Sequence, residues 1–388
     1  MYKIKSYLLL LALGAVMGTS GAPPAADCRL TNLRCEMLTN PLGIDARYPR
    51  LSWEIGSNER NVKQTAYQVL VASSREKLAA GEADCWNSGR VASDQSIHVK
   101  YAGKLLKSGD ACYWKVKAWT NKGVAEWSEP ASWTMGLLYY KDWPRGWIGF
   151  DEPFPGDNIT TDSRLSACYF RKEFEAEKKI STATVSIMGL GLYELSINGK
   201  KVGDAVLAPA PTDYTKNVKY NTYDVTAYLR EGKNAVGVVL GNGRFFAMRQ
   251  HSKPYKIKTF GFPKLLMALT IRYTDGTTRT IATDESWKGT PDGPIRANNE
   301  YDGEEYDARK EMPGWNSPGF DDSGWLRARY VQEPAGAYEA QMNEPIKVMR
   351  ELPAVSVTKL TGDRFVVDMG QNMVGWVRLR VKESAGSR

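Results

Sequence analysis

The chain has 388 residues, of which 42% are hydrophobic and 25% charged, and its formal net charge is +8. That length is too great for one ordinary hydrophobic core, so we expect two or three domains of soluble globular type. The basic excess is spread along the chain, with no run of five or more Lys or Arg residues and with acidic residues interleaved throughout. This dispersed charge argues against a nucleic-acid partner.

The first residues have the order of a secretory signal peptide. Two lysines precede an apolar stretch from Tyr7 to Met17, and small residues and prolines follow from Gly18 to Ala26. The apolar stretch is too short to span a bilayer. We therefore expect residues 1–26 to be a cleaved signal peptide and the mature protein to be exported to the periplasm or the extracellular space.

A lipid anchor on Cys28 is the less favoured alternative to a fully released protein. The preceding Ala25-Ala26-Asp27 is a poor match to the apolar-small-small sequence that directs lipidation. No other segment is long and apolar enough to predict a transmembrane helix.

Cysteine and histidine usage limits the chemistry that the chain can support. The five cysteines are widely spaced and show no CxxC pattern, and there are two histidines, so metal sites and Ser-His-Asp triads have little raw material. In an oxidising compartment Cys28 with Cys35, or Cys85 with Cys112, could pair. The remaining cysteine is Cys168.

Short alternating strands predict a β-sandwich over residues 27–138. The predicted strands cover residues 50–55, 66–72, 96–99, 111–119 and 131–135. Gly, Asn, Asp and Pro separate them, as is typical of a sandwich of about 100 residues. Pro49 with Trp53, Tyr113-Trp114, and Trp127 with Pro130 resemble a fibronectin type III domain. We expect its tryptophans to be core and bracing residues rather than sugar-stacking platforms.

A second, longer block of strands covers residues 147–334. Its clearest strands are residues 168–174, 182–187, 191–197, 235–240 and 264–271. Asn198-Gly199 is the strongest short-range hairpin signal in the chain, and Asp275-Gly276 marks a second turn. Many strands with long loops predict a jelly-roll sandwich of the galactose-binding-like type.

The last segment, residues 335–388, predicts the start of another β domain. Residues 377–381 alternate apolar and basic side chains, which indicates a half-buried strand. Gly370 and Gly375 bracket Gln371-Asn372 and predict a tight link to a preceding strand. Such strands need partners for their backbone and apolar face. We interpret the segment as truncated and expect it to be poorly ordered alone.

Several motifs in the second block resemble the N-terminal β-sandwich domain of bacterial α-L-rhamnosidases. The matching stretches are residues 195–204, 207–209, 212–214, 220–226, 241–243, 300–309, 314–315 and 320–325. Residues 368–376 are similar to the opening of the concanavalin-like domain that comes next in the same family. With the fibronectin-like front, the resemblance covers nearly all of the mature chain and implies an all-β protein.

The resemblance implies hydrolysis of terminal α-L-rhamnosides with inversion, a reaction that uses two carboxyl groups. In this family both come from an (α/α)₆ barrel that follows these domains, so no catalytic residue is assigned to this sequence. The implied role is structural support or binding of rhamnose-containing glycans. Two alternatives stay open: a free-standing secreted carbohydrate-binding or adhesin-like protein, and one half of a split enzyme whose catalytic domain is supplied in trans.

By analogy with family members that use this sandwich to bind rhamnose with the help of calcium, we expect two groups of site residues. The predicted sugar contacts are Asp204, Asp213, Tyr214, Asn242 and Phe245. The predicted calcium ligands are Asp302, Glu304 and Asp307, because oxygen ligands on a glycine-containing loop suit Ca²⁺. The alternative for these three carboxylates is surface pairing with Arg309 and nearby lysines.

Two departures from the family pattern weaken the expected sugar pocket. Family sequences often carry an aromatic residue before Thr-Asp-Tyr and another after Gly-Asn-Gly, where this chain has Ala210-Pro211 and Arg244. An aromatic face is the usual support for a sugar ring. Tyr214, Phe245 and Phe246 could substitute or could be core residues. The adjacent Asp321-Asp322 is most simply a turn.

Overall fold

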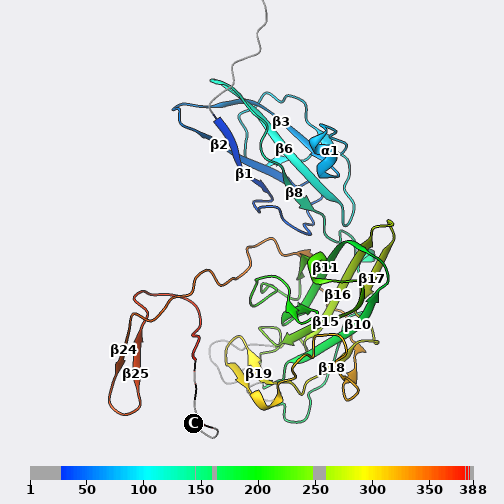
Figure 1. The fold of residues 1–388 in the computed structure, drawn as a ribbon, viewed down its shortest axis with the longest axis vertical. Helices are drawn as coiled ribbons and strands as arrows, with labels where there is room; N and C mark the ends of the chain where they lie inside the picture. The colour runs from blue at the N-terminus through cyan, green and yellow to red at the C-terminus, as the bar shows by residue number, and fades with distance from the viewer. Residues whose placement is uncertain are drawn as a thin grey trace, which may run out of the picture.

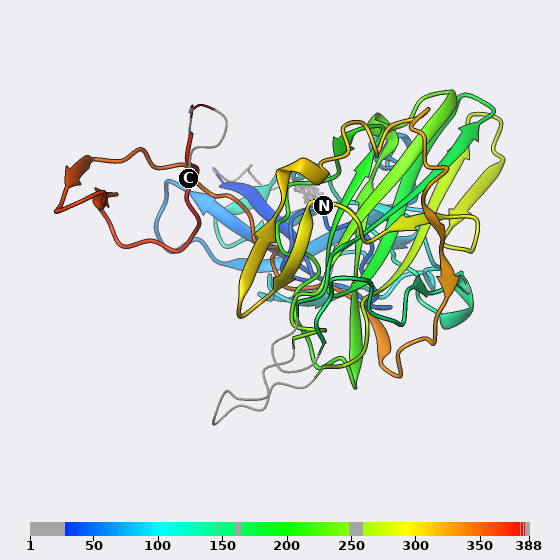
Figure 2. The same ribbon diagram turned by 90° about the horizontal axis from the view of Figure 1, so that it is seen from below.

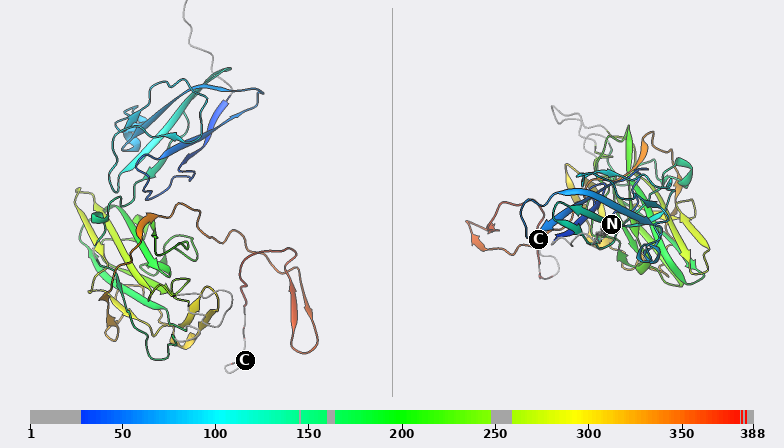
Figure 3. Two further views of the ribbon diagram at one scale, coloured as in Figure 1. Left: turned by 180° about the vertical axis from the view of Figure 1, so that it is seen from behind. Right: turned by 90° about the horizontal axis from the view of Figure 1, so that it is seen from above.

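The computed structural model describes residues 28–144, 146–159, 164–247, 259–380, 382 and 384. The predicted signal peptide therefore lies outside the described residues. Two β-sandwiches follow one another along the chain, and a C-terminal segment projects to one side of them (Figures 1 and 3). The prediction of an all-β fold is confirmed. No helix in the described part of the chain has the length and apolar character needed to cross a membrane.

The first sandwich packs two antiparallel sheets around a tryptophan-rich core. One sheet has the order β1-β2-β5, and the other has the order β4-β3-β6-β7 with β8 also paired to β6. Its elements are β1 (Cys28–Cys35), β2 (Arg50–Ser57), β3 (Gln64–Ala72), α1 (Arg75–Ala79), β4 (Trp86–Asn87), β5 (Val99–Lys100), β6 (Ala111–Thr120), β7 (Gly123–Ala125) and β8 (Ala131–Thr134). Trp53, Trp114 and Trp133 are buried, as predicted for core residues.

The Cys28–Cys35 pair, one of the two pairings that the sequence left open, is excluded by the structure. These residues are the two ends of β1. A strand rises about 3.3 Å per residue, which separates the two Cα atoms by roughly 20 Å, whereas a disulfide requires less than about 7 Å. Extended backbone between the two cysteines therefore excludes a bond.

The second sandwich contains a six-stranded sheet, β13-β12-β15-β10-β18-β21, and a larger sheet, β22-β9-β16-β11-β14-β23, with β17 paired to β16. Its elements are η1 (Tyr140–Asp142), β9 (Ile148–Gly149), β10 (Cys168–Ala176), β11 (Ile180–Leu190), β12 (Leu192–Ile197), β13 (Lys200–Lys201), β14 (Asn217–Asp224), η2 (Thr226–Tyr228), β15 (Gly232–Gly241), β16 (Lys264–Tyr273), β17 (Thr278–Ala282), β18 (Lys288–Thr290), β19 (Ile295–Asn299), β20 (Gly303–Tyr306), η3 (Ala308–Lys310), β21 (Leu326–Arg327), β22 (Arg329–Tyr330) and β23 (Ala337–Ala340). The core between the sheets includes Phe170, Val238 and Leu269, all fully buried.

The predicted Asn198-Gly199 hairpin joins β12 to β13. Both residues have positive φ, 51° and 79°, and Ile197 pairs with Lys200 across the turn. Asn and Gly tolerate this left-handed backbone better than other residues, which is why the dipeptide specifies the turn. The hairpin prediction is confirmed.

A tight aromatic junction joins the two sandwiches. The Trp143 ring packs edge-on against Tyr220, with centroids 5.0 Å apart, and Trp147 Nε1 donates to the Tyr338 hydroxyl at 2.7 Å. Gly136, at the end of the first sandwich, has no room for a side chain because a Cβ would lie 2.1 Å from the Tyr220 hydroxyl oxygen. The two sandwiches therefore meet in a packed interface where the first predicted block ends.

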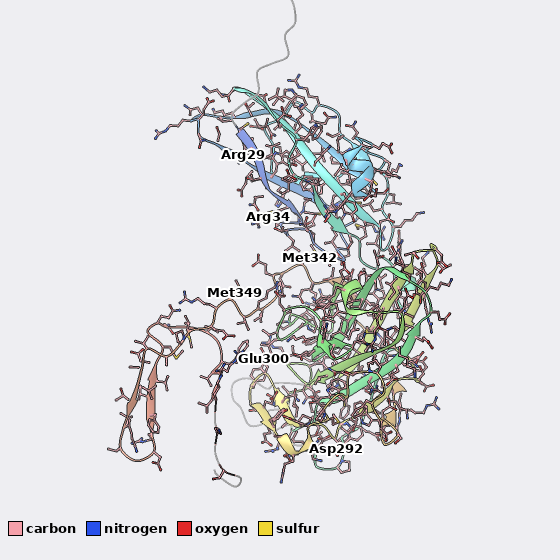
Figure 4. The ribbon with its side chains drawn as sticks, viewed as in Figure 1. Arg29, Arg34, Asp292, Glu300, Met342 and Met349 are labelled. Carbon is pink, nitrogen blue, oxygen red and sulfur yellow. The ribbon has the colours of Figure 1, made fainter. Side chains whose placement is uncertain are left out.

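The second sandwich extends beyond residue 334, where the sequence predicted its end. β23 pairs in parallel with β14, so the second sandwich continues to Ala340. The Ala340 N–H also donates to Asp45 Oδ2 of the first sandwich at 2.7 Å. Met342 lies beside this junction, whereas Met349 lies on the projecting segment (Figure 4).

Over its described residues, the projecting C-terminal segment holds one hairpin, β24 (Ser356–Lys359) and β25 (Phe365–Asp368). Among the described residues these strands pair only with each other, and Figure 2 shows them standing away from the sandwiches. Their apolar side chains are exposed. The strand predicted at 377–381 is wrong over residues 377–380, because no described strand lies alongside to pair with them; residue 381 is outside the described residues.

Candidate functional site

A pocket of about 410 Å³ opens on the second sandwich, near the start of β16 and the stretch between β22 and β23. Segments far apart in sequence meet there. The lining residues are Asp151, Leu190, Tyr214, Thr215, Phe245, Phe260, Gly261, Phe262, Lys264, Gln332, Glu333, Pro334 and Ala335. The pocket thus combines an aromatic wall with a polar one.

Three rings in mutual contact form the aromatic wall. Tyr214 packs edge-on against Phe245 and Phe260, with centroids 5.1 and 5.2 Å away, and Phe245 stacks on Phe260 at 6.0 Å. Tyr214 and Phe245 are buried, whereas Phe260 is 42% exposed. Burial raises the pKa of Tyr214 to about 12, so its hydroxyl is neutral at physiological pH. Two buried rings therefore support one accessible ring.

The polar wall is built around a lysine at the start of β16. Lys264 Nζ contacts the two carboxylate oxygens of Asp151 at 2.8 and 3.1 Å. Lys264 is buried, and Asp151 is partly exposed, so the pair presents acceptor atoms at the pocket edge. Glu333 adds a carboxylate that accepts a hydrogen bond from the Tyr140 hydroxyl. Paired charges of this kind bind hydroxyl groups without carrying a large net charge.

Asp213 and Asn242 shape the loops that carry the aromatic wall. Asp213 Oδ1 accepts from the Thr215 hydroxyl at 2.6 Å and from its N–H at 3.2 Å, and these bonds lower the pKa of Asp213. The buried Asn242 side chain donates to the carbonyl oxygens of Leu165 and Asn298 at 2.6 and 2.8 Å. Neither residue lines the pocket. Their contacts fix the turns beside Tyr214 and Phe245.

The other predicted sugar contact, Asp204, lies apart from this pocket. It is not among the lining residues, and its carboxylate pairs with Lys347 Nζ at 2.9 Å. Beside this ion pair, the backbones of Ala205 and Lys347 form a short antiparallel β-bridge. The structure thus brings Tyr214 and Phe245 into one pocket and leaves Asp204 at the root of the projecting segment.

The predicted calcium ligands occupy the β19–β20 hairpin and the turn after it. Asp302 Oδ2 accepts from Asn299 Nδ2 at 2.9 Å. Asp307 caps η3 and pairs with Arg309 at 2.8 Å, which lowers the pKa of Asp307 to about 2. Within the described ranges, no group of three or more His, Cys, Asp or Glu residues is placed to hold a metal ion. Calcium binding at this hairpin stays a prediction.

The Asp321-Asp322 pair forms a turn, as expected, and also does something that the sequence did not indicate. Asp321 Oδ1 accepts from the Ser323 N–H at 3.0 Å. Asp322 forms an ion pair with Arg171, whose side chain is 1% exposed. The second carboxylate therefore neutralises a buried charge in the sandwich.

Sequence reasoning missed most of the pocket lining. Phe260 and Phe262 bracket Gly261 just ahead of a strand that was predicted, and this aromatic spacing was the one available signal. Lys264 sits at the first position of that strand. No local sequence pattern connects Asp151 or Glu333 with Lys264.

Family models match three parts of the chain in order. Residues 30–139 match a Rha78A-like N-terminal immunoglobulin domain, and residues 178–350 match an α-L-rhamnosidase N-terminal domain. Residues 358–388 match a bacterial α-L-rhamnosidase concanavalin-like domain. The three descriptions agree with the two sandwiches and the projecting segment.

Individual relatives agree with the family models. An α-L-rhamnosidase of Formosa agariphila is 38% identical over 370 residues, which is 90% of this chain and 38% of that protein. The α-L-rhamnosidase structure from Dictyoglumus thermophilum has 39% identity and a TM-score of 0.80, covering 91% of this chain and 39% of that one. For the Streptomyces avermitilis α-L-rhamnosidase complexed with L-rhamnose, the identity is 28%, the TM-score 0.77 and the coverage 89% and 49%.

The chain therefore spans between about two fifths and a half of the length of these relatives. The agreement extends over sequence, domain order and fold. By these criteria the chain matches the N-terminal portion of the α-L-rhamnosidases.

Proposed function

We propose that this chain is the non-catalytic N-terminal portion of an exported α-L-rhamnosidase-type glycoside hydrolase, and that its own contribution is to bind rhamnosides. The parent reaction would be hydrolysis of terminal α-L-rhamnosides. The observation that carries the binding proposal is the pocket that Phe260 lines together with the Lys264–Asp151 pair. Export rests on the residue pattern of the first 26 positions.

The composition of the pocket suits a deoxy sugar. Rhamnose carries a methyl group where most hexoses carry a hydroxymethyl group, so one end of its ring is apolar. An aromatic ring covers such a surface, and convergent polar groups orient the hydroxyls. Phe260 and Phe262 supply the first element, and Asp151, Thr215 and Glu333 supply the second.

We assign no catalytic residue to the described part of the chain. Glycoside hydrolysis needs two carboxyl groups on opposite sides of the scissile bond. In the pocket, Asp151 is neutralised by Lys264, and Glu333 accepts a hydrogen bond from Tyr140. These contacts suit binding. A free-standing carbohydrate-binding protein, or one half of a split enzyme, would use the same pocket in the same way.

Titration calorimetry with L-rhamnose tests the binding proposal. L-Mannose is the matched control sugar, because it differs only by the hydroxyl on the exocyclic carbon. We expect L-rhamnose to bind at millimolar concentration and Phe260→Ala to weaken it by about tenfold, which corresponds to about 1.4 kcal/mol. Tyr48→Ala is the matched control variant, since this exposed tyrosine lies in the first sandwich.

The same titration separates the remaining alternatives. Equal heats for Phe260→Ala and the parent chain would move the site elsewhere, and no heat with either sugar would leave a structural role alone. Repeating the titration in calcium and then in chelator tests Asp302 and Glu304. Chelator-insensitive binding that survives Asp302→Ala would remove calcium from the proposal.

A further inference from the structure

A second pocket, of about 540 Å³, shares a wall with the candidate rhamnoside pocket. Glu333 lines both pockets, residues 330 and 331 line the second, and residues 332, 334 and 335 line the first. Its volume lies within the range of about 300–1,000 Å³ that is usual for small-molecule sites. The described residues that line it are Tyr140, Gly146, Trp147, Tyr330, Val331 and Glu333.

Strand pairing fixes the shared wall. Tyr330 is the last residue of β22 and pairs with Ile148 of β9. The Val331 N–H extends this pairing by donating to the Trp147 carbonyl oxygen at 2.9 Å. Because the wall is already held against the sheet, a ligand does not have to order its backbone, and ordering a binding segment costs affinity.

Tyr330 presents an accessible ring on a fixed support. The residue is 52% exposed. A Cβ at Gly146 would lie 3.0 Å from the Tyr330 Cε1 atom and 2.4 Å from the Thr283 carbonyl oxygen, so the ring lies directly against glycine backbone. The Thr283 hydroxyl donates to the Gly146 carbonyl oxygen at 2.7 Å, which holds that backbone in place.

Tyr140 supplies a second accessible ring. It is 53% exposed and packs on Tyr338, with ring centroids 5.7 Å apart. Tyr338 is itself held by the buried Trp147, whose Nε1 donates to the Tyr338 hydroxyl at 2.7 Å. The Tyr140 hydroxyl donates to the Glu333 carboxylate. The second pocket thus repeats the design of the first, in which inner aromatic side chains support an exposed ring beside a carboxylate.

We infer that the second pocket is a subsite for the sugar residue that is linked to rhamnose, so that the two pockets together bind a rhamnose-terminated disaccharide unit. The inference rests on the proposed function, because the first pocket must hold the rhamnose ring. Two accessible tyrosine rings suit the C–H faces of a pyranose. A carboxylate has about four acceptor positions, so Glu333 receives sugar hydroxyls while it keeps its bond from Tyr140.

The shared carboxylate favours a sugar over an aromatic aglycone. Glu333 is exposed at the boundary of the two pockets. An aromatic group would cover it without donating a hydrogen bond, and removing a carboxylate from water in that way costs free energy. A sugar ring instead carries hydroxyl donors on its rim and C–H groups on its faces. An aromatic aglycone is therefore the alternative that the experiment must separate.

Titration calorimetry of the full chain with matched ligands tests the inference. L-Rhamnose occupies the first pocket alone. Neohesperidose and rutinose carry D-glucose linked to α-L-rhamnose through different hydroxyls, and para-nitrophenyl α-L-rhamnoside carries an aromatic aglycone. We expect at least one disaccharide to bind about tenfold more tightly than L-rhamnose, because it adds ring contacts and hydroxyl bonds in the second pocket. The nitrophenyl compound should bind like L-rhamnose.

Variants assign the gain to the second pocket. Tyr330→Ala should lower the disaccharide affinity to that of L-rhamnose and leave L-rhamnose binding unchanged, which also shows that the first pocket is intact. Tyr330→Phe should keep the gain, since the ring remains. Phe260→Ala should weaken every ligand by the same factor. Tyr48→Ala, at a tyrosine of similar exposure in the first sandwich, should change nothing.

The possible failures separate this inference from the proposed function. Binding of L-rhamnose without a gain for either disaccharide would overturn the second subsite and leave the first pocket assigned. A gain that survives Tyr330→Ala would place the second sugar elsewhere and overturn the inference as well. An equal gain for the nitrophenyl compound would reject a sugar subsite. No heat with any ligand would reject the proposed function, and this inference with it.

Discussion

Leu269 in β16 and Val357 in β24 are both apolar residues of β-strands, but their side chains differ in burial. Leu269 is fully buried between the two sheets of the second sandwich, whereas Val357 is 60% exposed on the projecting hairpin. A strand pattern therefore specifies local conformation, and burial depends on whether other strands cover it. The two sandwiches and the C-terminal segment therefore differ in whether other strands cover their apolar side chains.

The largest difference in unfolding free energy between the two regions should come from removing a buried charged side chain. Arg171→Ala removes a guanidinium that donates to the Trp315 and Ser317 carbonyl oxygens and pairs with Asp322. Because the partner groups would be left without compensation, we expect a loss of about 3–5 kcal/mol in the free energy of unfolding. Urea denaturation followed by tryptophan fluorescence measures it.

The matched variant in the projecting segment is Arg378→Ala. Arg378 pairs with Glu351 at 3.1 Å, but both side chains are about 70% exposed. Exposed pairs contribute about 0–1 kcal/mol, so we expect almost no change. Equal losses for the two arginines would show that the segment is packed against the body in solution.

Apolar truncation gives the next largest contrast. Leu269→Ala should leave a cavity in the core and cost about 2–5 kcal/mol. Leu379→Ala, at a residue that is 81% exposed, should change the unfolding free energy by less than about 0.5 kcal/mol. Chemical denaturation of both variants tests the pair. A cost above 1 kcal/mol for Leu379→Ala would contradict an exposed segment.

Packing between the sandwiches should show a smaller effect. At Gly136 a Cβ would meet the Tyr220 hydroxyl at 2.1 Å and the Gly43 carbonyl oxygen at 2.6 Å. Gly136→Ala should therefore cost about 1–3 kcal/mol and loosen the junction. Calorimetry would register it as two separated unfolding transitions. Gly375→Ala, where nothing lies within 4 Å, is the control, and identical thermograms would refute a tight junction.

The smallest effect concerns an exposed ion pair of the body. Arg309 depresses the pKa of Asp307 to about 2, so the ionised carboxylate favours the folded state above pH 4, and this contribution disappears as the pH falls toward 2. Arg309→Ala should raise the Asp307 pKa toward its ordinary value of 3.8. Carboxyl NMR titration measures the shift. The depressed pKa of Asp213, which depends first on Thr215, should not move.

Much of the fold could be predicted from the sequence because its signals are local. Asn198-Gly199 specifies a turn by its own backbone preference, and the alternation around Trp114 identifies an inward-facing strand side. The strand expected at 377–381 failed for the complementary reason, since its alternation is local but its partner is not. Pattern alone does not supply a neighbouring strand.

The pocket was predicted only in part, because only some of its residues lie near local sequence signals. Tyr214 lies in a motif with a family resemblance, Phe245 follows another such motif by two residues, and both line the pocket. Phe260, Lys264 and Glu333 come together only when the sheets fold, so no spacing in the sequence connects them. The pairing of Asp322 with Arg171 is likewise a product of topology, over a separation of 151 residues.

The pairing of β23 affects the direction of the chain that follows it. A polypeptide that leaves a domain usually inherits the orientation of that domain alone. Here the departure point is clamped twice, by pairing with β14 of the second sandwich and by the bond from the Ala340 N–H to Asp45 of the first. The direction in which the segment from Met342 to Met349 sets out is therefore a joint property of both sandwiches (Figure 4). Farther along, the bridge between Lys347 and Ala205 and the ion pair between Lys347 and Asp204 hold that segment against the second sandwich.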